Sequence, residues 1–279
     1  MDLADRIAVV TGAGSGFGAA MAHEFARAGM SVAVLDIDEE RARQTAAAVA
    51  ELGVGAEGVR VDVGDPQSIL DAARRVAERF GGCDLLCANV GVQQFGSIDR
   101  LTDDDWTWVL GVNVMGTIRT VAAFLPQIRR RTGWRHIAIT ASSGVLLPAV
   151  RLAAYTTSKF AVMGYGETLR LELEPEGIGV TLVFPAGMIT RHLESSALAR
   201  PDALGASITM PDDIEAMLAS QPGSAGPSIA SPEDAARDLL PQLLANVPYV
   251  LTHGTYRADY ELRRAEMDRA FDRLEGRGS

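Results

Sequence analysis

Short apolar runs alternate along the chain with longer stretches in which apolar and polar positions recur at helical spacing. The apolar runs predict six strands, near residues 6–11, 31–36, 57–62, 84–89, 135–141 and 178–184, and a seventh near 248–252. The amphipathic stretches predict helices over 17–28, 39–52, 66–80, 103–130 and 154–174. Strands that are apolar throughout are typical of a parallel sheet covered on both faces. The pattern therefore predicts an α/β fold of the Rossmann type, a doubly wound parallel sheet of about seven strands with helices on both faces.

No internal repeat or charged linker divides the sequence 1–279, so we expect a single domain. The segment 191–232 interrupts the alternation because it is rich in proline and glycine. It follows the carboxyl end of a strand, where ligands bind in open α/β sheets, which favours a substrate-binding loop or lid over a surface insertion. The stretch 256–279 predicts a helical tail with Leu262, Met267 and Phe271 on an apolar face, packed against the body or a partner subunit.

Composition narrows the possible partners. The 279 residues are 47% hydrophobic and 22% charged, which is ordinary for a globular protein, and the net charge is −10. This acidic balance argues against nucleic acid or an anionic membrane as a partner. The first residues lack a signal peptide's pattern, and no apolar run approaches the ~18 residues of a membrane span, so we expect a cytoplasmic protein. Cys83 and Cys87 lack a second Cys or His pair, which favours core positions over a metal site or a disulfide.

A glycine-rich turn links the first strand to the first helix. Residues 11–18 fit the spacing T-G-x-x-x-G-x-G and not the commoner G-x-G-x-x-G. Glycines in such a turn let backbone N–H groups at a helix N-terminus approach a diphosphate. A purely structural turn is the alternative. The pattern predicts dinucleotide contacts at Thr11, Gly12, Ser15, Gly16, Phe17 and Gly18.

Asp36 ends the second strand, about 20 residues after the glycines, where a carboxylate accepts hydrogen bonds from both adenosine ribose hydroxyls. The same carboxylate repels a 2′-phosphate. Since neither Ser15 nor Ile37 supplies a compensating positive charge, the sequence favours NAD over NADP. Asp36 also suits the N-cap of the next helix, and both roles are compatible. Asp62 and Val63, at the end of the third strand, are expected beside the adenine, with a helix cap as the alternative for Asp62.

The 26 basic residues include a single lysine, Lys159, which stands four positions after Tyr155. On a helix the two side chains share one face. The ammonium group then favours the ionised phenol and draws a tyrosine pKa of about 10 toward neutrality. A shift of roughly 3 units corresponds to about 4 kcal/mol, so we expect a second positive charge to contribute.

Taken together, these motifs resemble the short-chain dehydrogenase/reductase family over about residues 5–190 and the strand near 250. Ser142 stands thirteen residues before Tyr155, and Asn113 lies within Val-Asn-Val. Where the family has Asn-Ala-Gly, the chain has Asn89-Val90-Gly91. Where the family commonly has Pro-Gly-x-Val-x-Thr, residues 185–190 place Ala186 at the glycine position.

The resemblance implies that Tyr155 is the general acid/base, that Ser142 orients the substrate oxygen, and that Lys159 binds nicotinamide ribose and lowers the pKa of Tyr155. It also implies that Asn113 kinks its helix and holds a water for a proton relay through Lys159. Oxidised nicotinamide supplies the second positive charge. The alternatives are that Asn113 satisfies backbone groups and that Ser142 bonds locally, with Ser143 as a rival; the family spacing favours Ser142.

Further cofactor contacts follow from the resemblance. The carboxamide of nicotinamide is expected at the Met188 N–H and the Thr190 hydroxyl. The full set implied for the later strands is Asn89, Val90, Gly91, Tyr155, Lys159, Pro185, Gly187, Met188 and Thr190.

The expected activity is that of an NAD-dependent oxidoreductase, an alcohol dehydrogenase or ketone reductase that interconverts a secondary alcohol and a ketone by hydride transfer. Substrate contacts are expected at Ser142 and Tyr155. Arg151 and Arg191 either face an acidic substrate or lie at the surface. A small-to-medium, apolar substrate is favoured by apolar residues near the site, namely Val92, Phe95, Leu146, Leu147, Pro148, Val150, Leu193 and Leu198.

Two other functions fit the same motifs. One is an epimerase or dehydratase that passes through a transient ketone, and the other is a non-catalytic regulator that senses NAD(H). The family resemblance further implies a homotetramer, with the helices near 103–130 and 154–174 at its interfaces.

Overall fold

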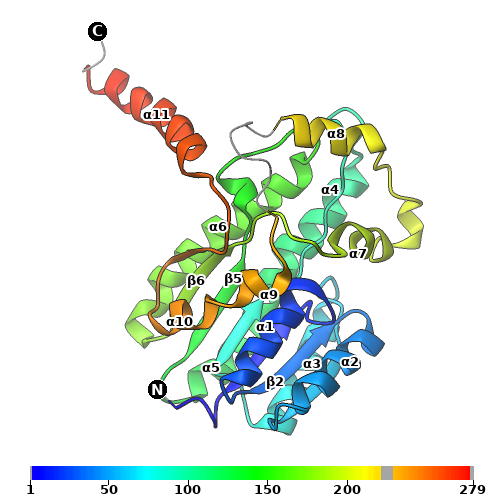
Figure 1. The fold of residues 1–279 in the computed structure, drawn as a ribbon, viewed down its shortest axis with the longest axis vertical. Coiled ribbons are helices and arrows are strands. Elements are labelled where there is room, and N and C mark those ends of the chain that lie inside the picture. The colour runs from blue at the N-terminus through cyan, green and yellow to red at the C-terminus, as the bar shows by residue number, and fades with distance from the viewer. Residues whose placement is uncertain (1, 221–228, 277–279) are drawn as a thin grey trace.

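The computed structural model describes residues 2–220 and 229–276 and shows one seven-stranded sheet (Figure 1). Its strand order is β3-β2-β1-β4-β5-β6-β7, and every neighbouring pair is parallel. The strands are β1 (Ile7–Thr11), β2 (Ser31–Asp36), β3 (Ala56–Arg60), β4 (Leu85–Ala88), β5 (His136–Thr140), β6 (Gly179–Phe184) and β7 (Tyr249–Leu251). The predicted fold class and the seventh strand are both confirmed.

Helices cover both faces of the sheet, and each face has its own apolar core. The main helices are α1 (Gly16–Arg27), α2 (Glu39–Ala50), α3 (Pro66–Phe80), α5 (Thr117–Arg130) and α6 (Ala153–Leu173). Successive residues of a strand point to opposite faces. In β1, Val9 therefore joins the core beneath α3, α5 and α6, whereas Ala8 and Val10 join the core beneath α1 and α2. Cys83 and Cys87 are buried and free, one in each core, as predicted.

The helix predicted over 103–130 contains an irregularity. α4 (Asp103–Leu110) runs into a wider π-helical turn, Gly111–Gly116, before α5 begins. Asn113 lies within that turn, and π-turns inside α-helices are frequent at functional sites. By length and composition alone the whole stretch would be able to cross a membrane, but 44% of its apolar window is buried in the fold, as is typical of a core helix.

The segment 191–232 is more ordered than the predicted loop. It contains α7 (His192–Leu198) and α8 (Pro211–Ala219) and ends in α9 (Pro232–Ala236); residues 221–228 lie outside the described residues. Ion pairs fasten it to the body. Arg200 Nη1 lies 2.7 Å from Asp105 Oδ1 with both side chains buried, and the buried Asp213 pairs with Arg100.

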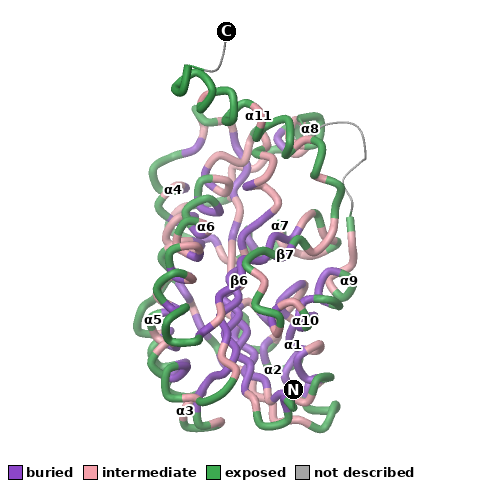
Figure 2. The backbone as a smooth tube through the Cα atoms, turned by 90° about the vertical axis from the view of Figure 1, so that its left-hand side faces the viewer, coloured by how far each residue is buried: buried purple, intermediate pink, exposed green. Residues whose placement is uncertain are grey.

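The carboxyl-terminal helix leaves the body. α10 (Leu239–Leu244) packs beside α1, and β7 follows, but α11 (Arg257–Leu274) projects away from the sheet and has no buried residue (Figures 1 and 2). Of the two alternatives for its apolar face, packing against the body is wrong, because Leu262, Met267 and Phe271 are exposed, and packing against a partner subunit stays a prediction. Arg263 ties the helix back by donating to the carbonyls of Val145 and Leu146.

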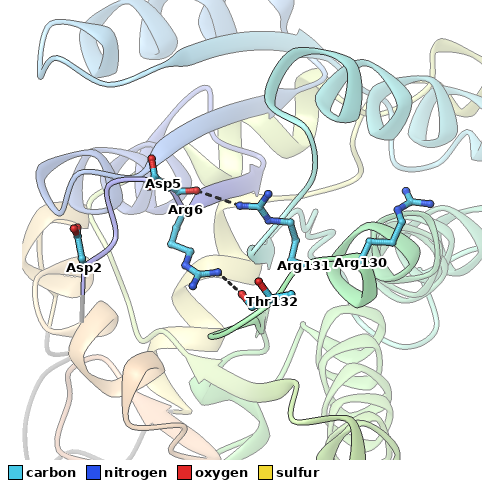
Figure 3. Close-up of a pocket in the computed structure, with 6 residues that line it drawn as sticks. All are labelled: Asp2, Asp5, Arg6, Arg130, Arg131 and Thr132. Carbon is cyan, nitrogen blue, oxygen red and sulfur yellow. Dashed lines mark hydrogen bonds between the residues drawn. The ribbon is translucent and has the colours of Figure 1, made fainter.

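A buried carboxylate closes the amino-terminal edge of the sheet. Asp84, just before β4, is fully buried and accepts hydrogen bonds from Arg6 Nη1 at 2.8 Å, from Arg131 Nε at 3.0 Å and from the Ile7 N–H at 2.9 Å. Figure 3 shows both arginines reaching onward, Arg6 to the Thr132 carbonyl at 2.6 Å and Arg131 to a backbone carbonyl near the amino terminus at 3.2 Å. One carboxylate thus joins β1, β4 and the end of α5.

We expect Asp84→Ala to lower the free energy of unfolding by about 3 kcal/mol, because removing one partner leaves buried donors and charges unpaired. Urea denaturation measures the change. Asp71→Ala is the matched control, since Asp71 pairs with Arg74 at the surface and should cost no more than about 0.5 kcal/mol. Equal losses from the two variants would contradict the role assigned to Asp84.

Candidate active site

The carboxyl ends of β1, β2, β4, β5 and β6 open into one cavity of about 1030 Å³. It spans the point between β1 and β4 where the strand order reverses, which is where open α/β sheets bind their ligands. Its volume is at the upper end of the range of about 300–1,000 Å³ that is usual for ligand pockets. The predicted site residues that line it are Gly12, Ser15, Phe17, Gly18, Asp36, Asp62, Val63, Asn89, Val90, Gly91, Ser142, Tyr155, Lys159, Pro185, Gly187, Met188 and Thr190.

The turn after β1 has the backbone that its glycines permit. Gly12 and Gly16 adopt φ values of +64° and +54°, in the left-handed region that favours glycine. A Cβ on Gly18 would lie 2.1 Å from the Gly12 carbonyl oxygen, so α1 packs directly onto the turn. Ser15 is the N-cap of α1, but its side chain makes no capping hydrogen bond. The first N–H groups of α1 therefore remain available to an anion.

Thr11 and Asn89 hold the cavity floor together, Asn89 on its surface and Thr11 beneath it. The Thr11 hydroxyl accepts a hydrogen bond from the Asn89 N–H at 3.0 Å, and the Asn89 amide donates to the Thr11 carbonyl at 3.1 Å. On the other side, the Thr140 hydroxyl donates to Asn89 Oδ1 at 3.0 Å. Asn89 thus links the ends of β1, β4 and β5, and Thr11 supports the cavity without lining it.

Asp36 is held by backbone donors. Its Oδ2 accepts from the Gly14 N–H at 2.8 Å and its Oδ1 from the Asp38 N–H at 3.0 Å. Burial raises the pKa of Asp36, outweighing these hydrogen bonds. The N-cap of α2 is Asp38, whose carboxylate accepts from the Arg41 N–H at 3.1 Å, so the capping role considered for Asp36 is wrong.

Arg41 corrects a second expectation about this end of the cavity. It lines the cavity one turn into α2, with its Nε 3.0 Å from Asp38 Oδ2. The inference that no basic residue compensates for Asp36 did not take this side chain into account. That inference considered only the neighbouring positions 15 and 37, whereas a helical turn brings position 41 to the same edge.

The remaining cofactor-site residues divide between backbone support and cavity wall. Asp62 lines the cavity, and its Oδ1 accepts from the Gly64 N–H at 2.8 Å, so it also shapes its own turn. Gly91 leaves room for the lysine, because a Cβ there would lie 3.1 Å from Lys159 Nζ. Among the described residues, the non-glycine positions with positive φ do not include Ala186. Its backbone therefore does not require the glycine that the family commonly has there.

Ser142, Tyr155 and Lys159 meet in the cavity. The Ser142 side chain faces Tyr155 closely enough to lower the pKa of the phenol, and Ser142 Oγ accepts from the Gly144 N–H at 3.1 Å. Lys159 Nζ donates to the Thr140 carbonyl at 2.9 Å and lies 5.7 Å from the centre of the Tyr155 ring. Ser142, and not its rival Ser143, is therefore the hydroxyl that contacts the phenol.

Burial dominates the electrostatics of this cluster. It raises the pKa of Tyr155 above its usual value, although the hydrogen bond from Ser142 acts in the opposite direction. Burial also lowers the pKa of Lys159 to about 8. In the protein alone, the predicted downward shift of the Tyr155 pKa is therefore not present. A further positive charge is needed to lower the pKa of Tyr155. The same need follows from the size of the lowering, roughly 3 units, which one lysine is not expected to supply.

Asn113 serves the scaffold. Its side chain is fully buried, with Oδ1 accepting from the Val92 N–H at 2.7 Å and Nδ2 donating to the Val92 carbonyl and to Ser158 Oγ, each at 2.9 Å. Both amide hydrogens are thus used within the protein. Asn113 fixes the loop after β4 against α6, which agrees with the alternative that it satisfies backbone groups.

Arg151 and Arg191 each have an acidic partner. Arg151 Nε lies 3.6 Å from Asp213 Oδ1, and Arg191 lines the cavity while it pairs with Glu194.

Of the apolar residues expected near the substrate, five line the cavity and Leu146, Pro148 and Val150 do not. The five are Val92, Phe95, Leu147, Leu193 and Leu198.

The cavity residues that were not predicted include His192 and part of the carboxyl-terminal segment. His192, the first residue of α7, has its ring centre 6.3 Å from that of Tyr155, and burial together with the charge of Lys159 lowers its pKa to about 4. Its one sequence signal is its position two residues after Thr190. Tyr256 and Asp259 line the cavity from the chain's last helical segment. Only the fold brings that segment back to the site.

Comparisons with known proteins agree with this geometry. The family model for short chain dehydrogenases matches residues 6–200. A C alpha-dehydrogenase from Sphingobium sp. (strain NBRC 103272 / SYK-6) is 33% identical over 207 residues, which cover 74% of this chain and 68% of that protein. A short-chain dehydrogenase/reductase from Burkholderia phymatum, solved in complex with NAD, is 32% identical, with a TM-score of 0.85 over 96% of each chain.

The alcohol dehydrogenase from the archaeon Thermococcus sibiricus, solved with 5-hydroxy-NADP, shares the fold at 24% identity and a TM-score of 0.70, over 88% of this chain and 94% of that one. The chain belongs to the short-chain dehydrogenase/reductase family. It is accordingly an oxidoreductase with a Rossmann-type nucleotide site.

We expect acetic anhydride to acetylate Lys159 with a rate that rises through a midpoint near pH 8, because only the neutral amine reacts and burial lowers the pKa of Lys159 to about 8. The chain has one lysine, so peptide mass spectrometry resolves this site from the α-amino group, which serves as the internal control. A midpoint near the ordinary lysine value of about 10.4 would contradict the burial effect.

Proposed function

We propose that this protein is an NAD-dependent short-chain alcohol dehydrogenase or ketone reductase, acting on a secondary alcohol or the corresponding ketone. The observation that carries the proposal is that Ser142, Tyr155 and the Lys159 amine line one cavity, with Ser142 facing the phenol. Conversion of an alcohol to a ketone removes a hydride from carbon and a proton from oxygen. The site therefore needs a positioned acid/base beside the hydride acceptor, and this cluster supplies it.

The residues fit a nicotinamide dinucleotide. The glycine turn leaves a cradle that side chains would fill, since a Cβ on Gly16 would lie 3.3 Å from Thr190 and one on Gly12 would lie 3.3 Å from Val90. The turn and the start of α1 would hold the diphosphate, and Asp36 the adenosine ribose. When bound, nicotinamide supplies the hydride acceptor or donor and, in its oxidised form, a positive charge.

The chain's own residues divide the remaining work. Ser142 orients the substrate oxygen, and Tyr155 removes the hydroxyl proton or returns it in the reverse direction. Lys159 holds a positive charge 5.7 Å from the phenol ring, and its pKa of about 8 allows it to exchange a proton near neutral pH. Asn113 fixes the loop after β4 through the Val92 N–H. Gly91 lies in this loop, and its lack of a side chain leaves space for Lys159.

The segment 191–232 is proposed as the substrate lid. Its described residues place Leu193, Leu198, Met217 and Leu218 on the cavity wall, and these side chains favour an apolar substrate body. The homotetramer implied by the family resemblance and the cytoplasmic location expected from the sequence stay predictions.

We expect Tyr155→Phe to bind NADH within about threefold of the wild-type affinity and to lose roughly 10²–10⁴-fold in kcat, the usual contribution of a general acid/base. NADH absorbance with a panel of secondary alcohols measures turnover, and NADH fluorescence measures binding. Tyr165→Phe is the matched control, because Tyr165 packs against the core and does not line the cavity. Ordinary turnover by Tyr155→Phe would refute the proposed role.

For cofactor choice, we expect the wild type to favour NAD over NADP in kcat/KM. Asp36→Ala should narrow that preference about tenfold or more, because it removes a negative charge that repels the 2′-phosphate. Arg41 lines the same end of the cavity, so the double variant Asp36→Ala/Arg41→Ala should lose most of the gain with NADP. Preference for NADP by the wild type would contradict the assignment to Asp36.

A further inference from the structure

One polar side chain on the cavity wall has no part in the proposed proton transfer. His192 meets Tyr155 edge-on, with ring centres 6.3 Å apart and ring planes at 61°. Its backbone is held on both sides, since its N–H donates to the Thr190 hydroxyl at 3.3 Å and its carbonyl accepts from the Ser196 hydroxyl at 2.6 Å. Within residues 2–220 and 229–276, neither ring nitrogen has a hydrogen-bond partner.

The charge state of this ring limits what it can bind. Burial and the nearby Lys159 ammonium lower the pKa of His192 to about 4, so the imidazole is neutral at ordinary working pH. A neutral imidazole offers one N–H donor and one acceptor nitrogen. It therefore suits an uncharged oxygen better than a carboxylate or a phosphate. The ring is partly buried on the cavity wall, and its two nitrogens are free to pair with a bound molecule.

The surroundings place that oxygen close to the reacting group. Leu147, Leu152, Leu193 and Leu198 are among the residues that line the same cavity and give it apolar wall. The substrate's own reacting oxygen is proposed to sit between Ser142 and Tyr155. His192, across from the Tyr155 ring, is then positioned to bind an oxygen on the neighbouring carbon.

We propose that His192 is a specificity-determining residue that hydrogen-bonds a second oxygen, on the carbon next to the one that reacts. The substrate class is then an apolar secondary alcohol or ketone with an adjacent hydroxyl, ether or carbonyl oxygen. His192 neither gains nor loses a proton in the reaction, because the hydride leaves from the carbinol carbon and the proton leaves through Tyr155. This inference rests on the proposed function, since Tyr155 defines where the reacting oxygen lies.

The test uses two alcohols of similar shape, 1-phenylethane-1,2-diol and 1-phenylpropan-1-ol, in which a hydroxyl is replaced by a methyl group. We expect the wild type to have the higher kcat/KM for the diol, with oxidation at the carbon that bears the ring. His192→Phe should lower the diol-to-propanol ratio on the order of 10–100-fold, because a ring of similar size lacks the hydrogen-bonding nitrogens. His192→Gln, which keeps a donor and an acceptor, should restore part of the ratio.

His23→Phe is the matched control, because His23 lies on α1 away from the cavity, and its ratio should equal that of the wild type. NADH binding and the urea midpoint of each variant separate substrate recognition from cofactor binding and folding. An unchanged diol-to-propanol ratio in His192→Phe overturns the inference. The inference is also overturned if His192→Phe binds NADH more weakly and loses kcat/KM equally on both alcohols. Failure of the wild type on both probes also overturns it. Failure of the wild type across the whole alcohol panel overturns the proposed function as well.

Discussion

Exclusion of water from Tyr155 and Lys159 is the constraint on which the rest of the site depends. A phenol and an amine that share a buried cavity each resist their charged form, so the pKa of the tyrosine rises and that of the lysine falls to about 8. The same effect keeps His192 neutral, with its pKa lowered to about 4. The chain therefore holds its polar groups in place, and under the proposed function the positive charge of oxidised nicotinamide would bring the phenol toward its ionised form.

Keeping water out requires a rigid floor and an anchored wall. Asn89 provides the floor by joining the ends of β1, β4 and β5. Asn113 holds the loop above it with three hydrogen bonds. The wall that carries His192 continues into a segment fastened by the buried pair of Arg200 and Asp105. Such pairs add more to a defined geometry than to net stability, since burying two charges is costly in itself.

Much of the fold was predictable because its determinants are local. Apolar runs marked each strand, and Pro66 marked the start of a helix that Asp65 caps. Spacing located Gly12 and the pair of Tyr155 and Lys159, since one turn and one helix determine their positions. Asp36 was located by its place at the end of the second strand, and Ser142 by the family resemblance. The π-turn at Asn113 and the helices within 191–219 were not predicted as such, because they depend on contacts with distant segments that no local pattern reveals.

By itself, the sequence determined the parallel sheet, the phosphate-binding turn and the Tyr155–Lys159 pair, because strand alternation, glycine backbone freedom and helical spacing act over a few residues. Only the tertiary structure decided that Arg41 stands beside Asp36 and that His192 faces Tyr155. It also decided that, among the described residues, the Asn113 side chain makes all its hydrogen bonds to Val92 and Ser158. These relations join segments far apart in the chain. Their energetics also depend on burial, and burial is a property of the assembled fold.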